Sequence, residues 1–244
     1  MEKAYSVMAD YYEYLTYDCD TERWSQYICK RIKRYAKNLN GIDLGCGTGI
    51  ITRALSKEGF SVVGIDNNKE MLSKASLESD GILYIQKDLR RVKEFKSLGF
   101  ITAVNDVFNY IKQEDLVKVF TNFNKMLTKG GVVLIDFSSE YKLREILGNE
   151  PCFFDDEEVS YIWLNKMKGD KIEMDISYFL LDKESGLYEK REEKHLQYIH
   201  KTEDIINAFK SAGFEIIKTE GHLGKKLTAT SHRINFLVKK VKEK

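Results

Sequence analysis

The segment Asp43-Leu-Gly-Cys-Gly-Thr-Gly49 sets three glycines between a short apolar run and a segment with helical spacing. Glycine lets a backbone turn sharply and approach a bound molecule closely. A glycine-rich turn that follows a strand and opens a helix suits nucleotide binding, because the ligand can sit against the helix N-terminus. The segment therefore predicts an α/β fold with a nucleotide-type site, and it constrains the chain more than any other feature.

The chain around this turn alternates between strand-like and helix-like patterns, which predicts parallel βαβ units. The expected strands are residues 41–44, 60–65, 82–86, 100–104, 132–137, 214–218 and 234–238, and the expected helices between them are 50–57, 68–75, 114–127 and 202–212. Gly130-Gly131 is expected to end the third of these helices, and Thr202 to cap the fourth. The fold class is therefore α/β, with a doubly wound, seven-stranded, mostly parallel sheet.

Two further segments extend this core. Residues from about 5 to 39 are expected to be helical, and those from Trp24 to Tyr35 have the spacing of an amphipathic helix. Residues 151–199 instead alternate with period two and carry turn signals, which predicts a small antiparallel insertion of three strands. We therefore expect residues 1–150 and 200–244 to form one domain with an N-terminal helical lid, and 151–199 to form a cap over the substrate.

Acidic residues stand at the ends of successive strands. Asp43 precedes the glycine turn, Asp66 follows Gly45 by 21 positions, and Asp88 ends the third strand. That separation is the one expected for a carboxylate that binds ribose hydroxyls. A dinucleotide turn would need a third glycine where Ile50 stands, and Asp43 would repel a pyrophosphate. The pattern favours a cationic ligand such as S-adenosylmethionine. A nicotinamide dinucleotide stays the alternative ligand.

Further stretches strengthen this interpretation, namely Gly64-Ile-Asp66, Met71-Leu-Ser-Lys-Ala75, Gln86-Lys-Asp88-Leu89 and Leu127-Thr-Lys-Gly-Gly131. With them, residues 40–138 resemble class I S-adenosylmethionine-dependent methyltransferases, and residues 200–239 do so more loosely. The resemblance implies a Rossmann-like methyltransferase fold that binds S-adenosylmethionine and releases S-adenosylhomocysteine.

The same resemblance implies roles for individual residues. Gly45, Gly47 and Gly49, with Asp43 before them, would underlie the methionine part of the cofactor. The residues expected around the ribose, the adenine and the methionine amino group are Asp66, Asn67, Met71, Asp88, Leu89, Asn105 and Asp106.

A closer resemblance covers the N-terminal segment and the loop after the fourth strand. Residues 5–15 and Asn105-Asp-Val-Phe-Asn-Tyr110 look like a subgroup of small bacterial methyltransferases that carry an antiparallel insertion after the fifth strand. In that subgroup an aromatic N-terminal helix folds over the cofactor, and Tyr5, Tyr12 and Trp24 match its aromatic residues. A Gln-Arg pair usual late in the insertion is Gln197-Tyr198 here.

The candidates for catalysis are Asp106 after the fourth strand and two residues of the insertion, His195 and Tyr198. Methyl transfer mainly requires alignment and exclusion of water, so a general base is optional. His195 and Tyr198 would lie on opposite faces of a regular strand, so at most one of them points at the site. For His195, the simpler alternative to a catalytic role is a position on the surface. Tyr110, in the loop after the fourth strand, could likewise simply pack in the core.

Charge and composition limit which molecules the protein is expected to bind and where in the cell it is expected to work. A net charge of +1 gives no general attraction for nucleic acid, and Asn105-Asp-Val-Phe lacks the proline pair of amino-methylating nucleic-acid enzymes. The four cysteines have no metal-ligand or disulfide spacing, and no apolar run approaches the length of a membrane span.

We therefore expect a cytoplasmic monomer or homodimer without a metal, acting on a small-molecule acceptor. Two alternatives remain open at this point. The chain could bind the cofactor and act through a partner protein, or it could methylate tRNA or another nucleic acid.

Overall fold

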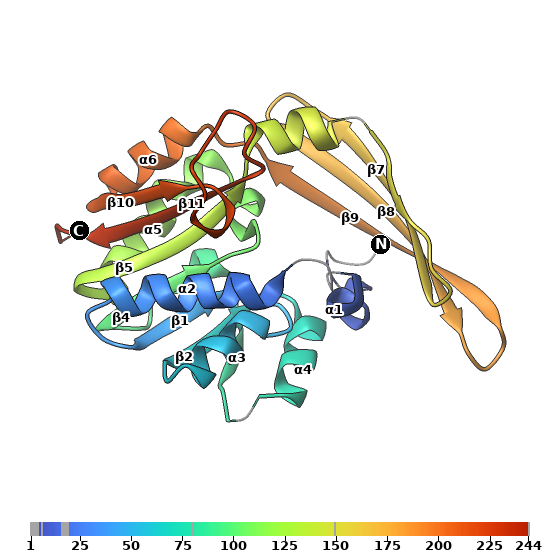
Figure 1. Ribbon diagram of the computed structural model, residues 1–244, viewed down its shortest axis with the longest axis horizontal. Coiled ribbons are helices and arrows are strands. Elements are labelled where there is room, and N and C mark those ends of the chain that lie inside the picture. Colours follow the sequence, from blue (N-terminus) through green and yellow to red (C-terminus); the bar gives the residue numbers. More distant parts are fainter. Residues whose placement is uncertain (1–4, 6, 16–19, 80, 149, 244) are drawn as a thin grey trace.

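Two β-sheets organise the molecule (Figure 1). The computed structural model describes residues 5, 7–15, 20–79, 81–148 and 150–243. One sheet has seven strands and lies between layers of helices, and the other has four strands and projects from it. The N-terminal segment lies between the two sheets. Three parts of the chain therefore converge at the place where the sheets approach each other.

The seven-stranded sheet contains β1 (Asn40–Leu44), β2 (Ser61–Asp66), β3 (Tyr84–Gln86), β4 (Leu98–Ala103), β5 (Leu127–Ser138), β10 (Phe214–Glu220) and β11 (Arg233–Lys240). Its order is β10-β11-β5-β4-β1-β2-β3. Neighbouring strands are parallel, except that β11 runs antiparallel to both β5 and β10. The predicted fold class is confirmed.

Five helices pack on this sheet: α2 (Thr21–Tyr35), α3 (Ile50–Lys57), α4 (Lys69–Leu77), α5 (Leu116–Met126) and α6 (Thr202–Ser211). Successive side chains of a strand point to opposite faces. In β5, Val132 and Leu134 pack with α2 and α3, whereas Val133 and Ile135 pack with α5 and α6. With both faces covered, a central strand is apolar throughout, and every residue of β4 is buried.

Two predicted helix boundaries were wrong. The pair Gly130-Gly131 does not end α5, because β5 already begins at Leu127 and runs through both glycines. Thr202 is the first residue of α6 and not its cap, since Lys201 holds the cap position without a side-chain hydrogen bond. Strand pairing decides the first boundary, because Leu127 pairs with Leu98 of β4.

The second sheet, which we call the cap, consists of β6 (Cys152–Phe154), β7 (Val159–Met167), β8 (Lys171–Asp182) and β9 (Leu187–Tyr198). The strands are antiparallel and follow one another in sequence order. The sequence predicted only three of them. The additional strand, β6, pairs Phe153 with Ile162 and is too short for a period-two pattern to reveal it.

The N-terminal segment was predicted as one helix and is not. Its described residues 5 and 7–15, which we call the lid, contain η1 (Met8–Asp10) and α1 (Tyr12–Leu15), and α2 begins only at Thr21. Apolar lid residues such as Val7 and Leu15 pack against Val159, Ile176 and Tyr178 of the cap. The lid is therefore held by the cap rather than by the helix that follows it.

Short helical turns complete the chain: η2 (Leu89–Arg91), η3 (Val107–Tyr110), η4 (Gln113–Asp115), the π-helical η5 (Lys142–Leu147) and η6 (His222–Gly224). The turn η3 follows β4 and contacts both β5 and β9. In the part of the chain that the structure describes, no helix is long and apolar enough to cross a membrane.

A buried asparagine joins the segment after the last strand to the core. The Asn124 amide in α5 donates hydrogen bonds to the carbonyls of Ala212 at 2.9 Å and Lys242 at 2.8 Å. We expect Asn124→Ala to lower the free energy of unfolding by about 2 kcal/mol, because it leaves these carbonyls without donors. Urea unfolding followed by circular dichroism measures the change. Lys125→Ala, at the exposed neighbouring position, is the control, and an equal loss in both variants would contradict this account.

Candidate functional site

The glycine turn is packed against the protein on one side and faces open space on the other. Gly45, Gly47 and Gly49 all have positive φ angles, of 67°, 55° and 84°. A side chain at Gly45 or Gly49 would collide with Val107 or Tyr84, whereas one at Gly47 would meet nothing within 4 Å. The turn therefore offers bare backbone to open space, which is what close approach of a ligand requires.

Asp66 holds this turn in place. One of its carboxylate oxygens accepts the Gly47 N–H at 2.9 Å, and the other accepts the Asn68 N–H at 2.8 Å. Each carboxylate oxygen can accept more than one hydrogen bond, so the side chain can also receive hydroxyl donors. Asn68 in turn caps α4 by accepting the Met71 N–H at 2.9 Å. The acid at the end of β2 thus connects the turn of β1 to the start of α4.

Asp43 lies behind the turn rather than in front of it. Its side chain is buried, and its two oxygens accept the hydroxyls of Thr52 at 2.7 Å and Thr102 at 2.8 Å. Burial raises the pKa of this carboxyl to about 6. Both oxygens have partners within the protein, so Asp43 ties β1 to α3 and β4 under the site.

The residues expected around adenine have different surroundings. Met71 is buried, Leu89 is half-buried and Asn67 is exposed. The carboxylate of Asp88 already pairs with Arg90, at 3.0 Å from Nε to each oxygen, and this contact lowers its pKa. Among the three predicted strand-end acids, Asp66 therefore has the geometry that best suits a ligand.

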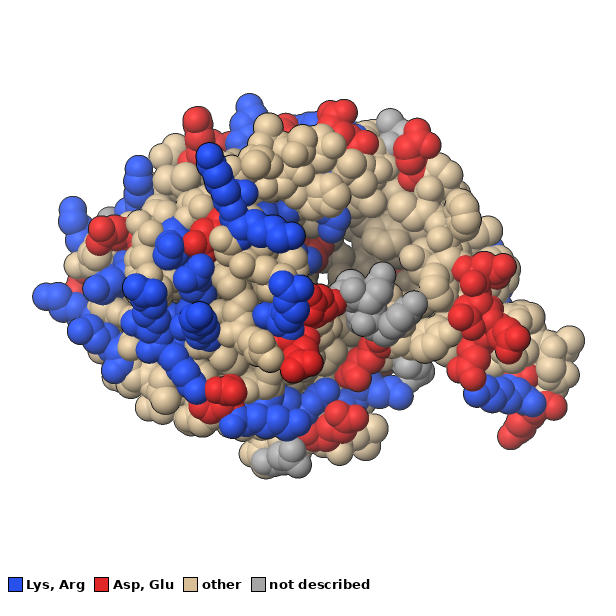
Figure 2. Space-filling view, in the orientation of Figure 1, with Lys and Arg blue, Asp and Glu red and all other residues tan. Residues whose placement is uncertain are grey.

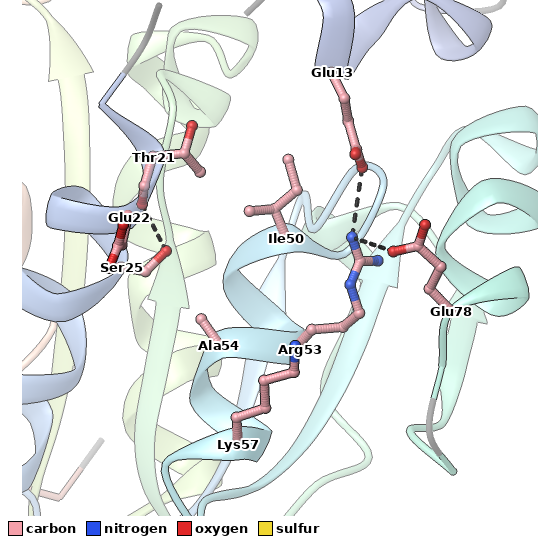
Figure 3. Close-up of a pocket in the computed structure, with 9 residues that line it drawn as sticks. All are labelled: Glu13, Thr21, Glu22, Ser25, Ile50, Arg53, Ala54, Lys57 and Glu78. Atoms are coloured by element: carbon pink, nitrogen blue, oxygen red, sulfur yellow. Dashed lines mark hydrogen bonds and ion pairs between the residues drawn. The ribbon is translucent and has the colours of Figure 1, made fainter. Parts of the chain in front are cut away.

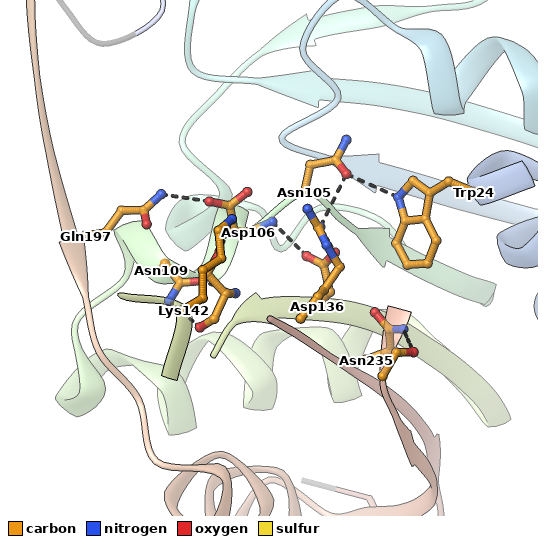
Figure 4. A network of polar contacts seen from close by, with 11 residues as sticks. Trp24, Asn105, Asp106, Asn109, Asp136, Lys142, Gln197 and Asn235 are labelled. Atoms are coloured by element: carbon orange, nitrogen blue, oxygen red, sulfur yellow. Dashed lines mark hydrogen bonds and ion pairs between the residues drawn. The ribbon is translucent and has the colours of Figure 1, made fainter. Parts of the chain in front are cut away.

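A polar network lies beyond the end of β4 (Figure 4). The buried Trp24 donates from Nε1 to Asn105 Oδ1 at 3.1 Å. Asn105 and Asp106 both have positive φ angles, of 66° and 55°, which non-glycine residues adopt only at a cost. Buried Asp136 at the end of β5 holds this turn by accepting the Asp106 N–H at 2.7 Å and by pairing with Arg233.

Neither Asp136 nor Arg233 was among the residues predicted for the site. The only local signal for Arg233 is a charge at the start of the apolar strand β11. Its guanidinium lies 5.7 Å from the Trp24 ring centre. Arg233 thus connects the N-terminal helix α2 to β5 through the same network.

Three polar side chains of β9 face the seven-stranded sheet, namely Glu193, His195 and Gln197. Gln197 donates to Asp106 Oδ2 at 2.8 Å, and His195 Nδ1 lies 2.9 Å from the Tyr110 hydroxyl. Tyr198 falls on the other face of the strand, so the structure does not bring it together with His195 and Asp106. Glu193 was missed as a site residue, although the alternation along β9 places it on the His195 face. For Tyr110 the sequence left a site role and core packing open.

The lid completes this group. The Tyr5 hydroxyl lies 3.0 Å from that of Tyr110, and its ring centre lies 6.3 Å from that of Tyr12. Figure 2 shows the surface hollowed between the two sheets. Side chains from the lid, from η3 and from β9 thus converge where the cap meets the carboxyl ends of β1 and β4.

A second cavity, of about 460 Å³, lies on the outer side of α3 (Figure 3). There Arg53 donates to the carbonyl of Thr48 at 2.6 Å and pairs with Glu78 at 3.1 Å and with Glu13 of the lid at 3.4 Å. These contacts link the glycine turn to the lid from behind. Among the described residues, no group of three His, Cys, Asp or Glu side chains could hold a metal ion.

Comparisons with known proteins agree with this geometry. A family model described as a methyltransferase domain matches residues 42–131. A candidate methyltransferase of Geobacillus sp. (strain WCH70) is 29% identical over 97% of this chain and 99% of its own. The crystal structure of an S-adenosylmethionine-dependent methyltransferase from Clostridium acetobutylicum ATCC 824 covers 95% of this chain and 96% of its own, with 31% identity and a TM-score of 0.87.

The chain therefore belongs to the S-adenosylmethionine-dependent methyltransferases, of class I, and its cofactor is S-adenosylmethionine. The fold is shared more widely. The S-adenosylmethionine-bound structure of CalS10, an amino pentose methyltransferase from Micromonospora echinaspora, covers 93% of this chain and 97% of its own at 18% identity and a TM-score of 0.69. The expected family and cofactor are confirmed, and the nicotinamide alternative is set aside.

The buried carboxyl under the turn predicts a pH effect on stability. An unfolded Asp has a pKa of about 3.9, so the raised folded value makes the folded state hold its proton more tightly. The contribution of Asp43 is therefore fully present below about pH 4 and is lost as pH rises through 6. We expect the stability of Asp43→Asn relative to wild type to improve by about 2 kcal/mol between pH 4 and pH 7. Urea unfolding at both pH values tests this, and a difference that does not change with pH would contradict it.

Proposed function

We propose that this methyltransferase binds S-adenosylmethionine in front of the glycine turn and methylates a small molecule held in the hollow under the cap. The observation that carries the proposal is the open space at Gly47 beside Asp66, at the ends of adjacent parallel strands. Ligands of open α/β sheets bind at this edge. The residues present fit the cofactor, because bare backbone, a carboxylate and apolar side chains stand together there.

Different residues would bind different parts of the cofactor. The methionine part would lie against Gly45, Gly47 and Gly49 and against the backbone at Asn105. Asp66 would accept the ribose hydroxyls, and the adenine would lie near the residues expected there from the sequence, which are Asn67, Met71, Asp88 and Leu89. S-adenosylmethionine supplies an electrophilic methyl group on a positively charged sulfur.

Other predicted residues would act indirectly. Asp43 holds the strand beneath the turn through two threonines, and Trp24 orients the Asn105 side chain. Tyr5 and Tyr12 would cover the site from the lid. Asp106, held by Gln197 of the cap, would stand at the border between the cofactor and the acceptor.

The cap supports a small acceptor. We propose that residues 151–199 act as a substrate cap on a methyltransferase domain of residues 1–150 and 200–244, since β6–β9 form a sheet of their own. The hollow lies beside the cap and the lid, which favours a molecule small enough to fit between them. On the face shown in Figure 2, lysine and arginine side chains gather mainly over α2 and the C-terminal strands rather than over the cap, which favours a small molecule over a nucleic acid.

CalS10 shares this architecture and acts on an amino pentose, which also supports a small polar acceptor. We further propose that the protein works in the cytoplasm. The described cysteines Cys29, Cys46 and Cys152 are free thiols, as a reducing compartment maintains them.

The carboxylate of Asp66 provides the test of the cofactor site. We expect Asp66→Ala to weaken binding of S-adenosylhomocysteine about 10- to 100-fold, because charge-assisted hydrogen bonds to hydroxyls contribute about 1.5–3 kcal/mol. Isothermal titration calorimetry measures the affinity. Glu70→Ala removes an exposed carboxylate in the first turn of α4 and should leave the affinity within about twofold. Wild-type protein without affinity for either S-adenosylmethionine or S-adenosylhomocysteine would overturn the proposed function.

A further inference from the structure

Glu193 is a fully buried carboxylate with an unusual set of donors. It accepts hydrogen bonds from the backbone N–H groups of Tyr5, at 3.1 Å, and Met8, at 3.0 Å, and also from that of Val7. Its fourth partner is His195 Nε2 at 3.1 Å. A carboxylate has no hydrogen to donate, so Glu193 acts as the acceptor in these contacts. Glu193 therefore joins the cap to the lid and reaches a histidine at the same time.

These donors decide which nitrogen of His195 carries hydrogen. Ionised Glu193 can only accept, so we assign the imidazole hydrogen to Nε2 from the hydrogen-bond partners. The Nδ1 atom then presents a lone pair to the Tyr110 hydroxyl at 2.9 Å, and Tyr110 must donate to it. The Tyr110 oxygen is left to accept from Tyr5 at 3.0 Å. The hydrogen bonds therefore run in one direction, from Tyr5 through Tyr110 to His195.

The two tyrosine hydroxyls can pass a proton along, but neither can remain deprotonated as a phenolate. Burial raises the pKa of both Tyr5 and Tyr110, so both hydroxyls stay protonated at neutral pH. Asp106 and Tyr12 act on both hydroxyls in the same direction. Four charged or titratable groups surround these three hydrogen-bonded side chains: Glu193 on β9, Asp106 before η3, Tyr12 on the lid and Tyr178 on β8. Among Tyr5, Tyr110 and His195, the Nδ1 lone pair of His195 is the place where a proton can stay.

We propose that Tyr5, Tyr110 and His195 form a proton relay that deprotonates a hydroxyl or amine acceptor, with Glu193 as the positioning residue that holds His195 ready to accept. The inference rests on the proposed function and narrows its acceptor to nucleophiles that bear a hydrogen. It also gives the lid a chemical role, since Tyr5 and the N–H groups that bind Glu193 belong to the lid. The relay is complete only while the lid covers the site and excludes water.

The proposed step combines methyl transfer with proton transfer. The acceptor oxygen or nitrogen forms a bond to the methyl carbon as the carbon–sulfur bond breaks, and that electron pair stays on sulfur. The hydrogen of the acceptor passes to the Tyr5 oxygen, that of Tyr5 passes to Tyr110, and that of Tyr110 passes to His195 Nδ1. The resulting imidazolium is stabilised by the adjacent Glu193 carboxylate, as in hydrolase triads where a carboxylate orients and stabilises a histidine. One proton leaves to solvent when the lid opens.

The first experiment needs no acceptor. Nitrogen NMR of protein labelled in the histidine ring, with S-adenosylhomocysteine bound, should show His195 neutral with its hydrogen on Nε2. Tyr110→Phe should shift the Nδ1 resonance, because it removes the hydrogen-bond donor while keeping the ring. A hydrogen on Nδ1 in wild-type protein would overturn the relay, since that nitrogen could not accept from Tyr110.

The second experiment separates the relay from a structural role. Methyl transfer from radiolabelled S-adenosylmethionine is measured on a panel of amino sugars, phenols and aliphatic alcohols, with carboxylates as acceptors that need no base. With an acceptor that gives turnover, His195→Gln and Tyr110→Phe should lower kcat by about 10²- to 10⁴-fold. The KM and the affinity for S-adenosylhomocysteine should stay within a few-fold. With an alcohol, the residual rate should rise with pH, as hydroxide replaces the lost proton acceptor.

Lys194→Gln is the matched control, because Lys194 is exposed on the opposite face of β9 and next to His195. It should leave kcat unchanged. The relay is overturned if turnover occurs only with carboxylates, or if both site variants keep kcat within threefold of wild type. It is also overturned if they lose affinity for S-adenosylhomocysteine in proportion to activity. Failure of the proposed function would look different, since wild-type protein itself would then not bind S-adenosylhomocysteine.

Discussion

The buried carboxylate of Asp136 is the contact on which the functional edge of the sheet depends. It accepts the backbone N–H of Asp106 and pairs with Arg233, so it joins the loop after β4 to the first residue of β11. A charge buried in this way is stable only when it is paired and hydrogen-bonded. The strained backbone at Asn105 and Asp106 is held in place by these contacts, and η3 with Tyr110 follows from there. Trp24 joins the same network through Asn105, which brings the helix before β1 to the site.

A second buried carboxylate organises the other side of the hollow. Glu193 binds three backbone N–H groups of the lid, and it lies on the same face of β9 as His195 and Gln197. The lid, the cap and the loop after β4 are far apart in sequence, yet they meet through side chains two positions apart on one strand. The two carboxylates therefore have related roles: Asp136 positions the loop after β4, and Glu193 positions the lid.

Local patterns were sufficient where local physics decides the structure. The glycine turn, the helix at residues 50–57 and the acid at Asp66 were all predicted, because turn chemistry, helical periodicity and strand order are visible in short windows. The predictions that were wrong concern segments whose ends depend on a distant partner. Gly130-Gly131 lies inside β5 because β4 pairs with that segment, and β6 exists as a strand only because β7 pairs with it. The role of Asp43 toward the cofactor stays a prediction, and Thr52 and Thr102 take both of its oxygens beneath the turn.

The sequence by itself thus determined the fold class, the family and the cofactor. Each of these follows from residues close together in the chain or repeated at a fixed spacing. Only the tertiary structure decided which side chains of the lid, the cap and η3 meet one another. Tyr5 and Glu193 are separated by 188 residues, and Tyr110 and His195 by 85, so no local period connects them. Such contacts form because the cap folds back over the sheet and buries its polar face, where each buried donor and acceptor must find a partner.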